Sequence, residues 1–378
     1  MKIGILGGGQ LGKMLLQKAA DFDLDISVMD PDPDAPSRFL CKEFHKGDFR
    51  NYDDVLAFGR TVDLLTIEIE HVNTQALFVL EKEGVIIYPQ PNIVQLVQDK
   101  GAQKIFYRTH KIPTAGFQLV ANRASVVESE MALPFIQKLR REGYDGRGVK
   151  KIDSLSEKSN AFDAPSVLEE LVDLEMEISV IVARNARGEI VHYPLSGMIF
   201  NPEANLVEFL YSPVNVSKEI EEEAVAIAVE LINSLQMIGI LAVEMFLSKD
   251  GRLLVNEIAP RPHNSGHHTI EACVTSQYEQ HLRAILNWPL GSTRQTKPAV
   301  MINLLGEKKQ EGPAVYQGLE EILSMEETYV HLYGKKNTKP FRKMGHVTVL
   351  GDSLDEAMSK AKKIKSVLKV VSSGTISA

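Results

Sequence analysis

The 378-residue chain has little cysteine, a single tryptophan and no long apolar segment. Its two cysteines, Cys41 and Cys273, are too few for a disulfide framework or a zinc site, which indicates a reducing compartment. No apolar run approaches the roughly 18 residues that a membrane-spanning helix needs. The first residues lack the apolar core of a signal peptide. We therefore expect a cytoplasmic protein that has no membrane partner.

Positive charge is also in short supply, since the formal net charge is −8 at pH 7. General nucleic-acid binding needs a basic face that displaces counterions, so we expect no nucleic-acid partner. Any anionic ligand must instead be held by a local cluster of basic residues. The hydrophobic content of 44% and the charged content of 24% are ordinary for a globular protein, and the length allows two or three domains.

Apolar segments alternate between strand and helix patterns over residues 1–98. Such alternation predicts a Rossmann-like parallel sheet that is covered by helices. The expected elements are strands at 2–6, 25–29, 64–69 and 85–87, with a helix at 11–20.

The spacing changes after residue 98. A helix at 101–109 precedes short strands around a glycine-rich loop, and successive antiparallel strands are expected over 174–210. A helix with an acidic first turn is expected over 218–235, followed by strands at 239–247 and 252–258. The predicted fold class is therefore α/β and α+β. The predicted domains are residues 1–98, 99–172 and 173–378.

The first glycine motif has two interpretations. Gly7–Gly12 matches G-x-G-x-x-G between a strand and a helix, and Asp30 ends the next strand, which is the full dinucleotide fingerprint. The chain could thus be a nicotinamide-dependent oxidoreductase, or the motif could be a tight turn that binds no cofactor. The second interpretation is favoured, because later residues supply a more complete nucleotide site.

That second site is spread over residues 99–267. Lys100 and Lys138 can neutralise phosphate oxygens, and the loop 143–148 can fold over phosphates with its backbone N–H groups. Glu244 and Glu257, on adjacent predicted strands, are hard ligands that suit magnesium. A run of glutamates earlier in the chain also has a plainer interpretation as a solvated charged surface: Glu169, Glu170, Glu175 and Glu177.

Several of these motifs resemble one family. Gly143-Tyr144-Asp145-Gly146-Arg147-Gly148 and the twelve residues from Asn256 to His267 are similar to those of the N5-carboxyaminoimidazole ribonucleotide synthetase family, within the ATP-grasp superfamily. Gly7–Gly12 and Arg342–His346 resemble it too, so the similarity covers about the whole chain. Two positions depart from the pattern: Phe200 replaces a frequent histidine, and Glu142 replaces a frequent glycine.

The resemblance implies an ATP-grasp fold of three domains and a ligase that forms a C–N bond. Its substrates would be ATP, bicarbonate and aminoimidazole ribonucleotide. The reaction would pass through carboxyphosphate and would belong to purine biosynthesis. Magnesium would be the metal, with manganese as a substitute, and the protein would be a homodimer.

The resemblance also assigns roles to individual residues. Glu244 and Glu257 would hold the metal, and Asp145, Arg261 and His263 would be catalytic. The ATP contacts would be Lys100, Lys138, Gly143, Tyr144, Asp145, Gly146, Arg147, Gly148, Glu169, Glu170, Leu171, Val172, Glu177, Asn256 and Glu257. The ribonucleotide and bicarbonate would meet Gln10, Asp145, Arg261, His263, Asn264, Lys335, Arg342 and Lys343.

A basic segment near the carboxyl end supports a phosphate site. Five cations lie within the nine residues 335–343, between predicted strands at 329–333 and 346–350, so we expect a basic hairpin tip. Such tips are often only solvated, but in a chain of negative net charge this one suits a substrate phosphate. His267 and His268 are expected to be helix-start residues rather than ligands.

Three alternative functions stay open at this point besides the synthetase. One is the oxidoreductase described above. Another is a different ATP-grasp ligase, such as a formate-using transformylase or a biotin carboxylase. The last is a nucleotide-binding regulator without turnover, which the presence of Lys138, Glu244 and Glu257 disfavours.

Overall fold

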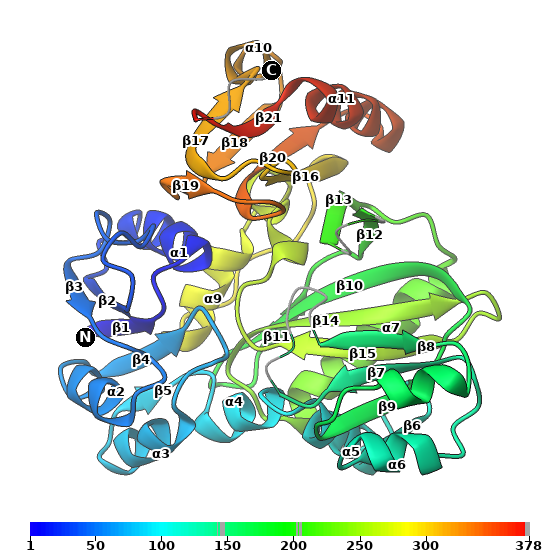
Figure 1. The fold of residues 1–378 in the computed structure, drawn as a ribbon. Coiled ribbons are helices and arrows are strands. Elements are labelled where there is room, and N and C mark those ends of the chain that lie inside the picture. Colours follow the sequence, from blue (N-terminus) through cyan, green and yellow to red (C-terminus); the bar gives the residue numbers. More distant parts are fainter. Residues whose placement is uncertain (142, 144–147, 202, 204–205, 375–378) are drawn as a thin grey trace.

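The computed structural model describes residues 1–141, 143, 148–201, 203 and 206–374. Figure 1 shows an N-terminal domain on one side, a large antiparallel sheet with a smaller sheet beside it on the other, and a C-terminal lobe above both. The mixed α/β and α+β class expected from the sequence is confirmed, since the N-terminal sheet is parallel and the large sheet is antiparallel.

The N-terminal sheet has the strand order β3-β2-β1-β4-β5, and all of its described pairings are parallel. Apolar clusters cover both of its faces, which explains why every residue of β1 and β4 is buried. Helix α9, which lies far along the chain, adds Tyr278, Leu282 and Ile285 to one cluster and so joins this domain to the rest. The elements are β1 (Ile3–Leu6), α1 (Gln10–Ala20), β2 (Ile26–Asp30), β3 (Glu43–Lys46), α2 (Tyr52–Gly59), β4 (Leu64–Ile67), α3 (Thr74–Lys82), β5 (Ile86–Ile87), α4 (Pro91–Val97) and α9 (Gln277–Ile285).

Helix starts follow local chemistry. The side chains of Asn51, Asn73, Asp99 and Ser217 each accept a hydrogen bond from a backbone N–H in the first turn of the helix that follows. These bonds satisfy donors that the helix itself leaves unpaired. Helix boundaries at these points are therefore encoded by neighbouring residues.

A smaller antiparallel sheet, with the strand order β6-β9-β7-β8, has its own core around Phe135 and Leu168. Helix α5 (Lys100–Thr109) precedes this sheet in the chain, but Tyr107 on α5 belongs to the core of the large sheet. The elements of the smaller domain are β6 (Phe117–Val120), α6 (Arg123–Glu128), β7 (Phe135–Leu139), β8 (Val149–Ile152), η1 (Ser156–Asn160) and β9 (Ser166–Glu170).

The large sheet runs β15-β14-β10-β12-β13-β16-β20-β18, with β11 beside β10. Helix α7 packs its apolar side on β10, β14 and β15 and closes the largest core cluster. The elements are β10 (Leu174–Arg184), β11 (Ile190–His192), β12 (Ser196–Asn201), β13 (Leu206–Ser212), α7 (Lys218–Ser234), β14 (Gly239–Ser248), β15 (Leu253–Ala259), η2 (Asn264–Gly266), α8 (Thr269–Ala272), β16 (Ala299–Leu305), β18 (Thr328–Leu332) and β20 (Lys343–Leu350).

The C-terminal lobe contains the hairpin expected from the sequence, with one strand longer than predicted. Strands β18 and β20 are antiparallel partners, and most of the basic segment lies in the connection between them. Strand β20 begins at Lys343, three residues before the expected strand, and Asn337–Thr338 of the connection forms β19, which pairs with β17. The early start was missed because Lys343 and Gly345 supply no apolar side chain to mark it. The remaining elements are β17 (Gly312–Gln317), α10 (Leu319–Leu323), α11 (Leu354–Val367) and β21 (Lys369–Ser372).

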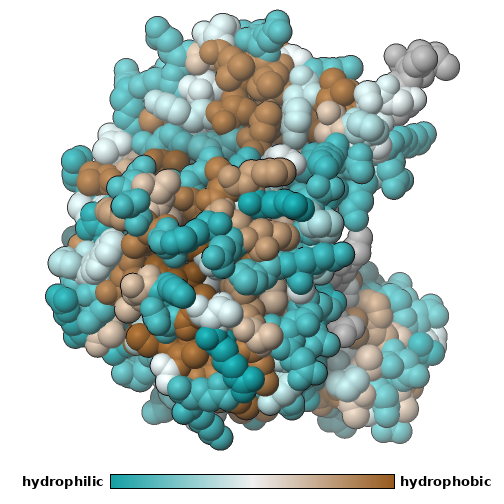
Figure 2. Space-filling model, turned by 90° about the vertical axis from the view of Figure 1, so that its left-hand side faces the viewer, coloured by the Kyte–Doolittle hydropathy of each residue, from teal (hydrophilic) through white to brown (hydrophobic). Residues whose placement is uncertain are grey.

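The surface that carries the N-terminal domain mixes apolar areas with charged ones, and an apolar area also lies over the C-terminal lobe (Figure 2). Large exposed apolar side chains occur in both parts, among them Phe39, Leu40, Leu323 and Tyr329. Within the described part of the chain, no helix is both long and apolar enough to cross a bilayer.

Candidate active site

The glycine turn after β1 is filled by the chain's own carboxylates. Gly7 has a φ of +99°, and a side chain there would meet Glu68 at 2.6 Å, so this position requires glycine. Glu68 accepts hydrogen bonds from the N–H groups of Gly9 and Gly12, each at 2.8 Å, while Asp30 accepts one from Gly8 at 2.7 Å. These N–H groups are the ones that bind a pyrophosphate in dinucleotide folds. Their engagement weakens the oxidoreductase interpretation.

The predicted phosphate lysines meet predicted acids across four elements. Lys100 of α5 forms an ion pair with Glu257 of β15 at 2.5 Å. Lys138 of β7 donates to Glu169 of β9 at 3.1 Å and to Asn256 of β15 at 2.7 Å. Residues that are far apart in the sequence therefore converge between the small sheet and the large sheet.

Three carboxylates lie on the large-sheet side of this region between the two sheets, which we call the cleft. Glu244 of β14 and Glu257 of β15 are direct cross-strand partners, and Glu177 lies on the neighbouring strand β10. Burial and the charge of Glu257 raise the pKa of Glu244, whereas the ammonium of Lys100 lowers the pKa of Glu257. Burial raises the pKa of Glu177 to about 7.

This carboxylate pair fits a magnesium ion. Its oxygens are hard ligands, and a divalent cation would relieve the repulsion between two neighbouring carboxylates. Among the described residues, no group of three or more His, Cys, Asp or Glu side chains is arranged to hold a metal. Magnesium would therefore take its remaining ligands from water and substrate phosphates, as it commonly does.

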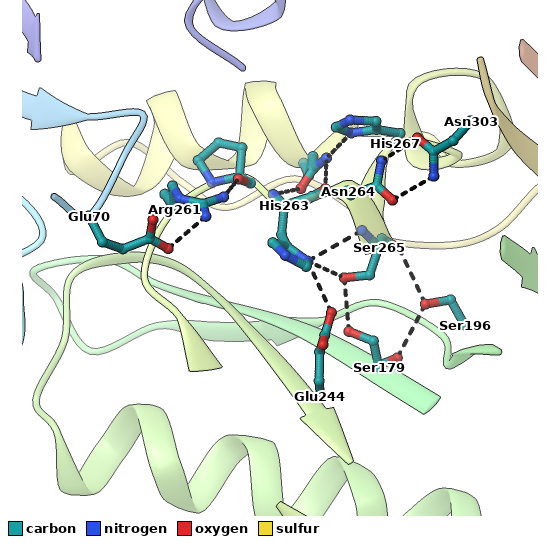
Figure 3. A network of polar contacts seen from close by, with 12 residues as sticks. Glu70, Ser179, Ser196, Glu244, Arg261, His263, Asn264, Ser265, His267 and Asn303 are labelled. Carbon is teal, nitrogen blue, oxygen red and sulfur yellow. Dashed lines mark hydrogen bonds and ion pairs between the residues drawn. The ribbon is translucent and has the colours of Figure 1, made fainter. Parts of the chain in front are cut away.

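The loop after β15 contacts Glu244, the N-terminal domain and β16, as Figure 3 shows. Arg261 pairs with Glu70 at 2.7 Å, just after β4. His263 Nδ1 lies 3.4 Å from Glu244 Oε1 and 3.0 Å from Ser265 Oγ. These contacts place His263 next to Glu244 of the carboxylate pair and tie Arg261 to the N-terminal domain.

Two asparagines fix the far end of the same loop. Asn264 and Asn303 exchange side-chain hydrogen bonds at 2.9 and 3.0 Å, so the loop is tied to β16 (Figure 3). His267 and His268 are buried beside α8, and burial lowers the pKa of both imidazoles. Their position at the start of this short helix agrees with the sequence-based expectation.

The basic segment divides into two parts. The positive charge of Lys343 lowers the pKa of both Glu244 and His267, which places Lys343 on the cleft side of the lobe. Lys335 donates to the carbonyl of Lys343 at 2.7 Å. Arg342 instead donates to the carbonyl of Asn337 at 2.7 Å, within the lobe. Gln10 is the first residue of α1, next to the turn that Glu68 fills.

Several predicted site residues lie at the surface near the end of β9 or outside the part of the chain that the structure describes. Glu170, the last residue of β9, and Leu171, which follows it, are exposed, and Val172 is half-buried. Gly143 and Gly148 flank the glycine-rich loop, whereas Glu142, Tyr144, Asp145, Gly146 and Arg147 lie outside the described residues. Phe200 packs beside the cluster of Met198, Leu210 and Met301.

The glutamate run does not form a uniform solvated surface. Glu169 is 3% exposed and paired with lysines, whereas Glu170 and Glu175 are exposed. Sequence reasoning gave no role to Lys104, which also pairs with Glu169. The available signal was its spacing, since Lys104 lies one helical turn after Lys100 and so on the same face of α5.

Comparisons with known proteins agree with this arrangement. Three family models match: the ribonucleotide synthetase preATP-grasp domain over residues 1–98, the ATP-grasp domain over 105–278 and the phosphoribosylaminoimidazole carboxylase C-terminal domain over 299–360. The crystal structure of N5-carboxyaminoimidazole ribonucleotide synthetase from Thermotoga maritima is 42% identical, with a TM-score of 0.91 over 98% of this chain and 99% of that one. The chain belongs to the N5-carboxyaminoimidazole ribonucleotide synthetase family of ATP-grasp proteins. The predicted family and ATP-grasp fold are thereby confirmed.

Two further relatives extend the comparison. The Aspergillus clavatus synthase, solved in complex with ADP and 5-aminoimidazole ribonucleotide, is 31% identical, with a TM-score of 0.88 and 97% of each chain covered. The chloroplastic phosphoribosylaminoimidazole carboxylase of Vigna aconitifolia is 37% identical over 94% of this chain. The present chain spans 65% of the length of that plant protein.

Proposed function

We propose that the chain is an ATP-dependent ligase that carboxylates 5-aminoimidazole ribonucleotide to N5-carboxyaminoimidazole ribonucleotide in purine biosynthesis. The observation that carries this proposal is the convergence of Lys100, Lys138, Glu244, Glu257 and the loop containing His263 in one cleft. The family relative with bound ADP and 5-aminoimidazole ribonucleotide supports the same two ligands here.

The cleft suits phosphoryl transfer to bicarbonate. Bicarbonate is a poor electrophile, so its oxygen first attacks the γ-phosphorus of ATP, ADP leaves, and carboxyphosphate forms. Lys100 and Lys138 stabilise the charge that spreads over the transferring phosphoryl group. The amine of the ribonucleotide then attacks the carboxyl carbon, phosphate leaves, and the amine loses a proton.

ATP lies between the two sheets in this proposal. Besides the two lysines, Glu169 and Asn256 position the phosphate end through their bonds to Lys138. Glu177 accepts from the ribose hydroxyls, and backbone groups of residues 170–172 meet the adenine edge. Gly143 and Gly148 border the loop that the resemblance assigns to the phosphates. Glu244 and Glu257 would hold magnesium, with manganese as a substitute, and the ion would supply positive charge that offsets the charge of the phosphates.

The ribonucleotide lies between this cleft, the N-terminal domain and the C-terminal lobe. Lys343, together with Lys335 and Arg342, provides the positive charge for its phosphate, and Arg261 faces it from the loop after β15. Gln10 and Asn264 complete the binding set. His263, next to Glu244 and Ser265, accepts and releases a proton during the reaction. Asp145 orients the attacking amine.

The predicted domain boundaries, the homodimer and the cytoplasmic location belong to the same proposal. The name of one relative, the plant carboxylase, places that protein in the chloroplast.

The deciding experiment measures ADP release with each acceptor. We expect ADP release to require magnesium and to rise strongly when aminoimidazole ribonucleotide and bicarbonate are present together. Lys138→Met, which removes a lysine proposed to bind the ATP phosphates, is the matched inactive control. Stronger stimulation by formate with glycinamide ribonucleotide would assign the chain to the transformylases instead.

A further inference from the structure

Lys104 is a buried cation that faces no ligand space. Its side chain is 3% exposed, and its ammonium lies 3.2 Å from Glu169 Oε2 and donates to Thr114 Oγ1 at 2.6 Å. Thr114 in turn donates to the carbonyl of Val255 at 2.7 Å. This chain of contacts joins helix α5 to strand β9 of the small sheet and to strand β15 of the large sheet.

The same oxygen of Glu169 also accepts from Lys138, at 3.1 Å. One carboxylate oxygen thus lies between two ammonium groups that differ in accessibility, since Lys138 is 13% exposed and Lys104 is 3% exposed. Lys138 also contacts Asn256, beside the carboxylate pair of the cleft. Lys138 can therefore turn to a phosphate, whereas Lys104 stays on Glu169.

We propose that Lys104 is a positioning residue for ATP. Lys104 holds Glu169 in place and compensates part of the negative charge of that carboxylate, so that Lys138 can bind the nucleotide phosphates. This inference rests on the ATP site of the proposed function and adds a residue to it.

The charge balance explains why the second lysine matters. Two ammonium groups and one carboxylate leave the cluster with a net positive charge, which attracts a phosphate. Without Lys104, Glu169 and Lys138 form an exclusive and nearly neutral pair, and removing Lys138 from it would leave a buried carboxylate unpaired, which is costly.

Lys104 remains charged at neutral pH. Burial lowers its pKa to about 8, while the charge of Glu169 opposes this effect and the charges of Lys138 and Lys100 add to it. In the folded protein the ammonium form therefore predominates at pH 7.

The test compares Lys104→Met with a matched control. Lys158 is also a buried lysine of the small domain, with 4% exposure and a hydrogen bond to the carbonyl of Ser129. We expect Lys104→Met to raise the KM for ATP about tenfold and to lower kcat as well, because a Lys138 that stays on Glu169 serves neither ATP binding nor the transferring phosphoryl group. The KM for the ribonucleotide should change by less than about twofold. Lys158→Met should leave all three parameters unchanged, and Lys104→Arg, which keeps a cation, should restore most of the ATP affinity.

The route through Glu169 is tested in a Glu169→Gln background. If Lys104 acts through that carboxylate, Lys104→Met should add less than about a twofold rise in the KM for ATP there. An equal rise in both backgrounds, or an unchanged KM for ATP in Lys104→Met itself, overturns the proposal. Thr114→Val, which removes only the hydroxyl that Lys104 contacts, should show the same selective effect in smaller measure if Lys104→Met fails to fold.

Equilibrium binding of magnesium-ATP, measured by calorimetry without any acceptor, separates this proposal from the proposed function. A weaker affinity in Lys104→Met supports the positioning role even if ribonucleotide and bicarbonate do not stimulate ADP release. An affinity equal to that of the wild type rejects it.

Discussion

Replacing Glu257 by Gln tests the centre of the cleft. Glu257 of β15 lies opposite Glu244 of β14 and pairs with Lys100 at 2.5 Å. The substitution therefore removes a negative charge that repels Glu244 and attracts Lys100. Loss of one metal ligand weakens charge stabilisation in phosphoryl transfer, and we expect turnover to fall about a hundredfold. That factor corresponds to about 2.7 kcal/mol in the activation barrier. The magnesium concentration for half-maximal rate should rise as well.

The fold should survive this change. The side chain of Glu257 is 45% exposed and that of Lys100 is 21% exposed, so their ion pair contributes only about 0–1 kcal/mol to stability. Relief of the repulsion between Glu257 and Glu244 offsets part of that loss. We therefore expect the melting temperature to change by no more than about 2 °C.

The assay is ADP release by a coupled enzyme across a magnesium titration, with a melting curve for each variant. Glu175→Gln is the matched control, since Glu175 is an exposed glutamate on β10. A Glu257→Gln variant that keeps full activity and an unchanged magnesium dependence would refute the ligand role.

Three further outcomes are expected. Asp145→Asn should partly uncouple the enzyme, so that phosphate released per carboxylated product rises; a ratio that stays near that of the wild type contradicts the amine-orienting role. Lys343→Ala should raise the KM for the ribonucleotide and leave that for ATP nearly unchanged, because a substrate phosphate contact adds uniform binding; a fall in ATP affinity instead would move the basic segment to the nucleotide site. Burial lowers the pKa of His281 from 6.5 to about 3, so the unfolded chain takes up a proton below pH 6.5 that the folded protein does not. His281 thus lowers the free energy of unfolding of the wild type by about 2 kcal/mol when the pH falls from 7 to 5. In urea unfolding, the free energy of His281→Gln should fall over this pH range by that much less than the free energy of the wild type. The control His192→Gln, at an exposed position, should fall as much as the wild type.

Much of the fold was predictable because its signals are local. Capping residues such as Asn51, Asn73 and Ser217 precede their helices directly, and the alternation of strands and helices in residues 1–98 requires a parallel sheet. The basic segment was harder to predict. Its hairpin was expected, but the strand that contains Lys343 and His346 begins three residues earlier than predicted, because Lys343 and Gly345 supply no apolar side chain to mark its start.

The sequence by itself also determined which chemistry the cleft can supply, because lysines, carboxylates and a glycine-rich loop keep their character wherever they lie. Only the tertiary structure decided which of these groups are paired. The glycine motif Gly7–Gly12 has the same local pattern with or without a ligand, and its N–H groups are taken because the fold brings Glu68 to them. Lys104 likewise resembles any helical lysine until the small sheet places Glu169 against it. Ion pairs between distant positions depend on the three-dimensional path of the chain, which residue identity and spacing do not specify.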